Sequence, residues 1–158
     1  MVEPLNMLSK PLGLLRDMIA NSATFQSWVG AIDATTAKPF IHFIRPPNTF
    51  TRPLALIDFG KEYNRQRTAN DKFEPSGDID LTFEEDITPA NTDNWQDAAF
   101  TFTNQIGKII EEIEAVQGVN PFLSIRAIEK RELMRSFEDE DDTLGDFYLA
   151  KFEVNWGV

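Results

Sequence analysis

Residues 93–117 read DNWQDAAFTFTNQIGKIIEEIEAVQ, and large apolar residues recur in this stretch at alternating intervals of four and three. Such spacing places them on one face of an α-helix, because one turn takes 3.6 residues. The helix either lies on the chain's own sheet, which is the commoner use of such a stripe, or pairs with a partner helix. Gly118 is the expected C-cap. The stripe consists of Trp95, Ala99, Phe102, Ile106, Ile109, Ile113 and Val116.

Five strands and an N-terminal helical segment are predicted around this helix. Residues 9–30 form the helical segment, in which Ser22 caps a second short helix that Gly30 closes. The order α-α-β-β-β-α-β-β predicts a single domain over residues 1–158 of α/β (α+β) class, with a mixed, mostly antiparallel sheet packed by the long amphipathic helix and the N-terminal helical segment. The predicted strands cover residues 39–45, 54–60, 78–87, about 122–135 and about 147–156.

Side chains alternate clearly in the strand over residues 78–87. Ile79, Leu81 and Phe83 are expected on one face of the sheet. The residues between them are polar and are expected on the other face: Asp80, Thr82 and Glu84.

The segment over residues 61–77, KEYNRQRTANDKFEPSG, is polar and lacks helical periodicity. It forms either a long loop or a protruding hairpin arm, and loops of this length in a compact domain usually serve a function. Tyr and Arg are residues that protein interfaces favour. The segment is therefore the predicted contact arm, with a surface excursion of no function as the alternative. The candidate contacts to a second subunit or another protein are Lys61, Tyr63, Arg65, Arg67 and Phe73.

Composition excludes several classes of protein. The 26 acidic and 15 basic residues give a net charge of −11, which disfavours general binding to nucleic acid or to an anionic membrane. There is no cysteine, so disulfides and thiol chemistry are excluded. The opening MVEPLNMLSKPLG is unlike a signal peptide, and no apolar run approaches the about 18 residues of a membrane span. A soluble, cytosolic domain is expected.

Positive charge is concentrated in one part of the chain. Residues 45–72 contain six basic and three acidic residues, a net of +3, so the remainder carries −14. Opposite charges at separate places suit head-to-tail contact between copies or partners. A salt-compensated surface without functional meaning is the alternative.

An acidic stretch, SFEDEDDTLGD, separates the last two predicted strands. An EF-hand loop needs Gly at its sixth position and a bidentate carboxylate at its twelfth. A loop starting at Asp139 puts Leu144 sixth, and one starting at Glu140 puts Lys151 twelfth. The spacing therefore predicts a solvated hairpin tip and no purposeful metal site. Its carboxylates are Glu138, Asp139, Glu140, Asp141, Asp142 and Asp146.

No pattern in the sequence indicates catalysis. His42 is the only histidine and lies within a short aromatic stretch, where a structural role is the default. The chain has no GxSxG, Gly-rich phosphate loop or HExxH motif. Neither an enzyme nor a cofactor is expected.

Residues 14–43, LLRDMIANSATFQSWVGAIDATTAKPFIHF, resemble the opening of the tail terminator (tail completion) proteins of long-tailed bacteriophages. In that family an opening helix is followed by a short Phe- and Trp-bearing turn of helix and then by the first strand. The strand, polar segment and strand over residues 54–87, the helix over 93–117 and the closing hairpin that ends FEVNWGV fit the same order. The resemblance covers nearly the whole chain and rests on element order.

This resemblance implies a homo-oligomer, a hexameric ring on the last ring of tail tube protein. The ring ends tail polymerisation and offers a joining face to the head-to-tail connector or head completion protein. It implies a virion protein of the tail or neck, present in the host cytoplasm during assembly, with no catalysis, cofactor or membrane. DNA would pass through without specific binding, and the acidic tip would face the lumen, where like charge keeps the genome from adhering.

Three other classes of protein are alternatives. The chain is alternatively another neck or connector component of the virion, which composition does not separate from a terminator. An acidic DNA-mimicking inhibitor would also be strongly negative, but it should display carboxylates along an extended face. A metal-assisted hydrolase built on the acidic tip is disfavoured by the failed ligand spacing.

If the acidic tip is only a hairpin turn, millimolar calcium, magnesium or zinc should barely change the melting temperature. A specifically bound ion at one hundred times its dissociation constant would stabilise the fold by about 2.7 kcal/mol. Thermal unfolding with and without each ion, with a chelator as the reference, checks this. A rise of several degrees with any of them would contradict the expectation.

Overall fold

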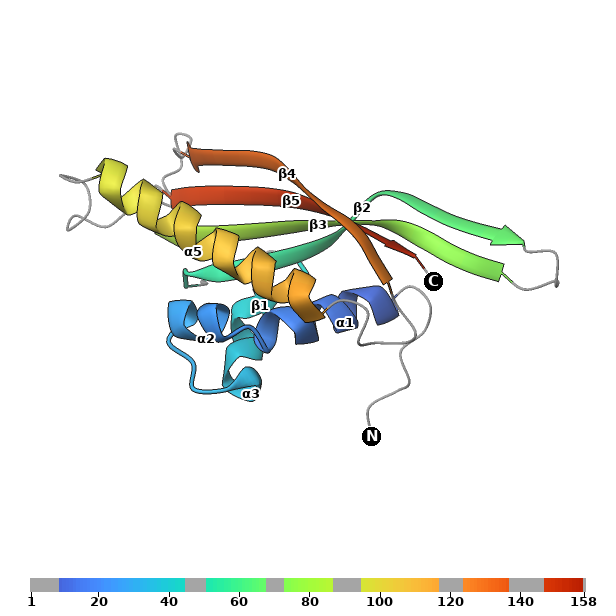
Figure 1. The fold of residues 1–158 in the computed structure, drawn as a ribbon, viewed down its shortest axis with the longest axis horizontal. Coiled ribbons are helices and arrows are strands. Elements are labelled where there is room, and N and C mark those ends of the chain that lie inside the picture. The colour runs from blue at the N-terminus through green and yellow to red at the C-terminus, as the bar shows by residue number, and fades with distance from the viewer. Residues whose placement is uncertain are drawn as a thin grey trace.

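The centre of the fold is a five-stranded sheet in the order β1-β2-β3-β5-β4 (Figure 1). The computed structural model describes residues 9–44, 51–67, 73–86, 95–116, 124–136 and 147–157, with backbone alone for 61–67, 73–74, 95 and 124–136. Only β1 and β2 run parallel, and the other neighbours are antiparallel. The fold is therefore α+β with a mixed, mostly antiparallel sheet, as predicted. The strands are β1 (Ile41–His42), β2 (Leu54–Arg67), β3 (Phe73–Asp86), β4 (Ser124–Ser136) and β5 (Phe147–Gly157).

The helices gather on one face of this sheet (Figure 1). The predicted helical segment divides as expected into α1 (Ser9–Ala20) and α2 (Ala23–Val29), and the long predicted helix is α5 (Trp95–Val116). A short helix α3 (Ala34–Ala37) and a 3-10 turn η1 (Lys38–Phe40) lead into β1.

The apolar stripe of α5 lies against the chain's own sheet and N-terminal helices. Phe102, Ile106, Ile109 and Ile113 are at most 2% exposed and belong to the same core cluster as the inner face of β3 and β5. This confirms packing on the sheet over pairing with a partner helix. The stripe ends before Val116, which is 42% exposed. The core residues of β3 and β5 are Ile79, Leu81, Phe83, Tyr148, Ala150, Val154 and Trp156.

Trp28 of α2 joins three elements in this core. Its ring lies 6.0 Å from that of Phe83 on β3 and 6.3 Å from that of Phe102 on α5, measured between centroids. Its indole Nε1–H donates to Glu85 Oε1 at 3.3 Å, so the polar end of a buried ring has an acceptor. Burial raises the pKa of Glu85 despite this hydrogen bond.

Polar contacts fix the start of α2 as the sequence predicts. Ser22 Oγ accepts a hydrogen bond from the Phe25 amide, and Gly30 ends the helix at φ 75°. Glu112 of α5 also reaches this end, where it accepts from the Ser22 hydroxyl and from the Thr24 amide and hydroxyl at 3.1 and 2.7 Å. Burial alone would raise the pKa of Glu112, but these hydrogen bonds outweigh it and lower the pKa.

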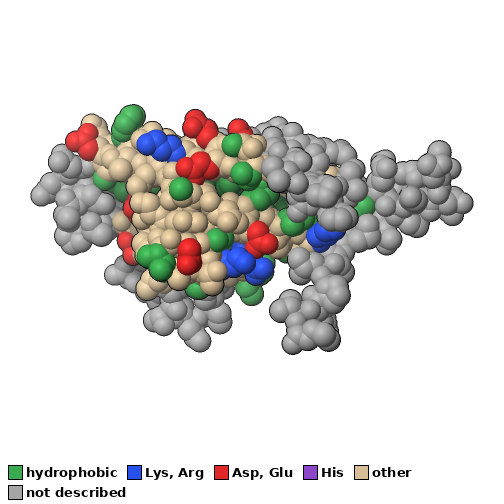
Figure 2. Space-filling model, turned by 60° about the horizontal axis from the view of Figure 1, so that its bottom comes forward, with side chains coloured by type: hydrophobic (Ala, Val, Ile, Leu, Met, Phe, Trp, Pro, Cys, Tyr) green, Lys and Arg blue, Asp and Glu red, His purple; other side chains and the backbone are tan. Residues whose placement is uncertain are grey.

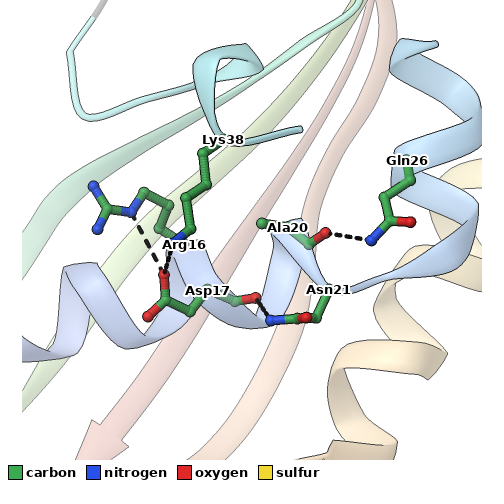
Figure 3. Close-up of polar contacts among 6 residues, drawn as sticks. All are labelled: Arg16, Asp17, Ala20, Asn21, Gln26 and Lys38. Atoms are coloured by element: carbon green, nitrogen blue, oxygen red, sulfur yellow. Dashed lines mark hydrogen bonds and ion pairs between the residues drawn. The ribbon is translucent and has the colours of Figure 1, made fainter. Parts of the chain in front are cut away.

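The end of α1 is held by a second polar group (Figure 3). Asp17 Oδ1 lies 3.3 Å from Lys38 Nζ of η1 and 3.7 Å from Arg16 Nε. The Asn21 amide side chain donates to the Asp17 carbonyl at 2.7 Å, and the same carbonyl also accepts the Asn21 backbone N–H at 3.0 Å. Because the pair between Lys38 and Asp17 is largely exposed to solvent, it orients η1 on α1 more than it stabilises the fold.

The predicted strand over residues 39–45 is wrong for most of its length. β1 has only two residues, and residues 34–40 are helical. Asp33 and Thr36 form a capping box in which Asp33 Oδ1 accepts from the Thr36 amide at 2.8 Å, and this starts α3. Pro39 lies at the start of η1, where its missing N–H is not needed. These local hydrogen bonds outweigh the β-propensity of the aromatic and branched residues.

Replacing Ile109 with Asp should lower the free energy of unfolding by on the order of 4 kcal/mol, because the new carboxylate would be buried without a partner. The matched control is Phe100→Asp on the same helix, since Phe100 is 74% exposed and its loss should cost no more than about 0.5 kcal/mol. Urea unfolding of both variants checks this. Equal stabilities would show that the stripe is not part of the core.

Candidate functional site

The polar segment over residues 61–77 forms a β-hairpin, which we call the hairpin arm. β2 and β3 remain paired as far as Arg67, which lies opposite Phe73. Of the two predicted alternatives, the structure has the hairpin and not the long loop. β5 accompanies β3 only from Ser76 onward, so the end of the arm projects past β4 and β5 (Figure 1).

The candidate contact residues all lie in the paired strands of this arm. Tyr63, Arg65 and Arg67 occupy alternate positions of β2, and alternate positions belong to one face of a strand. Their register partners are Gly77, Pro75 and Phe73, so the pairing brings two predicted contact positions, 67 and 73, opposite each other. Lys61 lies within the register shift between Phe59 and Tyr63.

A β-bulge marks the base of the arm. Between Phe59 and Tyr63 the strand β2 carries extra residues opposite Asp78, and such insertions bend a strand and increase its twist. Asp78 is only 4% exposed. A Cβ atom added at Gly60 would lie 2.2 Å from Asp78 Cγ, so the strands can approach this closely only with glycine at this position. A glycine inside a strand is a sequence signal for a bulge, and at Gly60 this signal could have located the base of the arm.

The sheet face opposite the helices carries a row of acidic residues, which we call the carboxylate row. Asp58 of β2 pairs with Asp80 of β3, and Asp80 pairs with Glu153 of β5. Residues directly opposite in neighbouring antiparallel strands lie side by side on one face. Asp58 is exposed and the other two are half-buried. On β4 the register continues the row with position 129, also a glutamate.

One end of the same face shows how this fold compensates negative charge. Arg52 Nε lies 3.0 Å from Glu84 Oε1, and Arg52 Nη1 lies 2.9 Å from Asp86 Oδ1. The guanidinium also stacks at 4.0 Å over the ring of Phe147, and this arrangement buries Arg52 and Glu84 almost completely. In the strands themselves, the only basic side chain described on this face is that of Lys151, which lies opposite Thr82.

The helical side of the molecule has a different surface. Acidic, basic and hydrophobic side chains are interspersed there (Figure 2). The carboxylate row is therefore a feature of the open sheet face, and its members come from three strands that are distant in sequence. Sequence reasoning missed the row because it depends on the register of those strands.

The other predicted site residues fall outside the arm and the row. Glu138, Asp139, Glu140, Asp141, Asp142 and Asp146 of the predicted acidic tip lie outside the described residues. His42 pairs with Leu56 at the edge of the sheet, and burial lowers the pKa of its imidazole. In the part of the chain that the structure describes, no three His, Cys, Asp or Glu side chains are grouped so as to hold a metal ion.

No protein-family model matches the chain, and no curated protein matches it. None of the helices in the described ranges is long and apolar enough to cross a membrane. The arm and the open sheet face are therefore the features from which function is inferred.

Replacing Gly60 with Ala should lower the free energy of unfolding by about 1–2 kcal/mol, because the new methyl group must displace the buried carboxylate of Asp78. The matched control is Gly107→Ala in α5, where nothing lies within 4 Å of an added Cβ. Alanine should stabilise that helix by about 0.5–1 kcal/mol. Urea unfolding measures both variants, and a Gly60→Ala protein as stable as the original would show that the close approach is not required.

Proposed function

We propose that the chain is a structural protein of a long-tailed bacteriophage, a subunit of a ring that caps the tail tube. In this role it ends polymerisation of the tail tube protein and provides the joining face for the head-to-tail connector or head completion protein. The order of its helices and strands, which resembles that of tail terminator proteins, supports the proposal. The role requires neither catalysis nor a cofactor.

The hairpin arm is the observation that carries this proposal. From Lys61 to Arg67 the strand β2 covers about 20 Å at the usual rise of a strand. A two-stranded hairpin is marginally stable in water unless it packs against something else. A projection that carries Tyr and Arg is therefore best explained as a contact to a neighbouring subunit or to the tube.

The charge of the chain supports the same role. A net charge of −11 suits a protein through which DNA slides, because a cationic wall would bind the phosphates strongly. The acidic tip over residues 138–146 is the part proposed to face the lumen.

Replacing Tyr63, Arg65 and Arg67 together by Ala should leave the chain folded and prevent capping, because the arm would lose its aromatic and cationic contacts. Tail tube protein polymerised with this variant should give tails of irregular length in electron micrographs. The matched control replaces Lys108, Glu111 and Glu114 on the exposed side of α5 by Ala, and its tails should keep a uniform length.

Two results would contradict the proposal. Uniform tails from the arm variant would show that the arm is not needed for capping. Tails of irregular length in the presence of the original chain, together with normal joining of heads, would favour the alternative role of another neck component. Light scattering with and without tail tube protein shows directly whether the two associate.

A further inference from the structure

We propose that the outer face of α5 in one copy binds a patch at the β1 edge of the sheet in a neighbouring copy. The proposal rests on the proposed function in that the chain must assemble with itself as the subunit of a ring. The two surfaces include neither the hairpin arm nor the acidic tip near the end of the chain.

Three large hydrophobic side chains are exposed at one edge of the sheet, and we call this surface the edge patch. β1 is the edge strand and pairs with β2 at Ala55 and Leu56. Phe43 and Ile44 directly follow β1, and Phe59 lies three residues beyond Leu56 on β2. Phe43 is 38%, Ile44 71% and Phe59 42% exposed. Exposed apolar side chains that gather in one place mark a site of interaction.

Positive charge borders the edge patch on the side of the helices. The Arg16 guanidinium of α1 lies 5.3 Å from the centre of the Phe43 ring. Arg16 Nε and Lys38 Nζ of η1 both approach the same carboxylate oxygen of Asp17 (Figure 3). Two cations thus share one anion, so positive charge remains in excess beside exposed aromatic area. A matching partner combines apolar area with carboxylates.

The outer face of α5 has this composition. Phe100 is 74% exposed, and it lies nine residues before the fully buried Ile109. That interval is about two and a half turns, so the two side chains leave opposite sides of the helix. Asp97 precedes Phe100 by about one turn, and Glu111 and Glu114 follow it by about three and four turns. These three acids are exposed, and none of them forms an ion pair with a described residue.

A glycine keeps the middle of this outer face low. Nothing lies within 4 Å of a Cβ atom added at Gly107, so the packing of the chain itself does not require glycine at this position. Glycine in the interior of a helix is less favourable than alanine. A neighbouring copy that packs directly on the helix backbone gives Gly107 a role. From Asp97 to Gly107 the face extends over about 15 Å.

Geometry makes the contact intermolecular. The buried stripe of α5 packs on the sheet, so Phe100 on the opposite side of the helix is directed away from the sheet. The edge patch belongs to the sheet edge and to α1 of the same copy (Figure 1). The two surfaces of one copy therefore do not meet. A contact between different surfaces of two copies is heterologous, and it closes into a ring when the rotation per subunit allows it.

Phe100 is the anchor of the contact, and the more distant charges form its rim. Aromatic side chains near the centre of an interface carry much of the binding energy, and Phe100 finds aromatic area at Phe43. Asp97, about one turn away, pairs with a cation of the edge patch. The acids beyond Gly107 are rim charges, which affect the rate of association more than its affinity. Their removal therefore leaves the contact in place.

Disulfide crosslinking tests the contact directly, because the natural chain has no cysteine. One variant carries Asn104→Cys, one turn after Phe100, and the other carries Ile44→Cys in the edge patch. A size tag on one variant identifies mixed dimers after oxidation. The matched control pairs Asn104→Cys with Asp58→Cys, an exposed position on the opposite face of the sheet, and should give about tenfold fewer mixed dimers. Equal yields in the two mixtures would overturn the proposal.

Light scattering of the purified chain gives an independent test. Replacing Phe100 with Ala should raise the dissociation constant of self-association by about tenfold or more. Because Phe100 is exposed, circular dichroism and thermal unfolding of this variant should stay unchanged. The matched control replaces Lys108, Glu111 and Glu114 by Ala on the same helix and should assemble as the original does. Equal assembly of the Phe100→Ala variant and the original would overturn the proposal.

A charge exchange shows which surfaces meet. Asp97→Lys alone should weaken self-association, since it places like charges together, and addition of Lys38→Glu to the same chain should restore it. A folded double variant that assembles no better than Asp97→Lys would overturn the proposal, as would an original chain that stays monomeric. Because these readings use the purified chain alone, they are distinct from a failure to cap tails. A chain that assembles through these surfaces but leaves tail length irregular would contradict the proposed function only.

Discussion

Packing of the α5 stripe against one face of the sheet is the interaction on which the rest of the structure depends. Burying each of Phe102, Ile106, Ile109 and Ile113 contributes about 1.5–3 kcal/mol before the cost of ordering, which together is comparable to the net stability of a small domain. The described helices all share this face, and Trp28 links α2 to it. The opposite face carries polar residues such as Asp58 and Asp80 together with apolar residues such as Leu56 and Leu149.

The hairpin arm begins where this hydrophobic support ends. β2 and β3 continue together beyond the end of β5, and the bulge at Gly60 and Asp78 changes their course at the boundary. A two-stranded hairpin by itself is only marginally stable in water. The structure thus combines a rigid base with a projecting element, an arrangement that suits contact with another molecule more than it suits stability.

The open face of the sheet carries negative charge in two different arrangements. At one end Arg52 contacts both Glu84 and Asp86 and is buried with the first of them. In the middle Asp58, Asp80 and Glu153 lie side by side, and each pair of like charges costs some stability. The Arg52 pairs join residues by direct contact, whereas the row arises from the register of three strands that are distant in the sequence.

The sequence by itself determined the elements whose signals are local. The stripe of α5 follows from a spacing of four and three, and Ser22 and Gly30 mark the ends of α2 because caps involve residues that are close in the chain. The prediction of a strand over residues 39–45 was wrong because two local signals compete there, and the Asp33 capping box starts a helix. Only the tertiary structure decided that the polar segment is a hairpin and that Asp58, Asp80 and Glu153 form a row. Alternation tells which face a residue occupies, but its neighbours on that face depend on strand order and register, which the packing of distant segments sets.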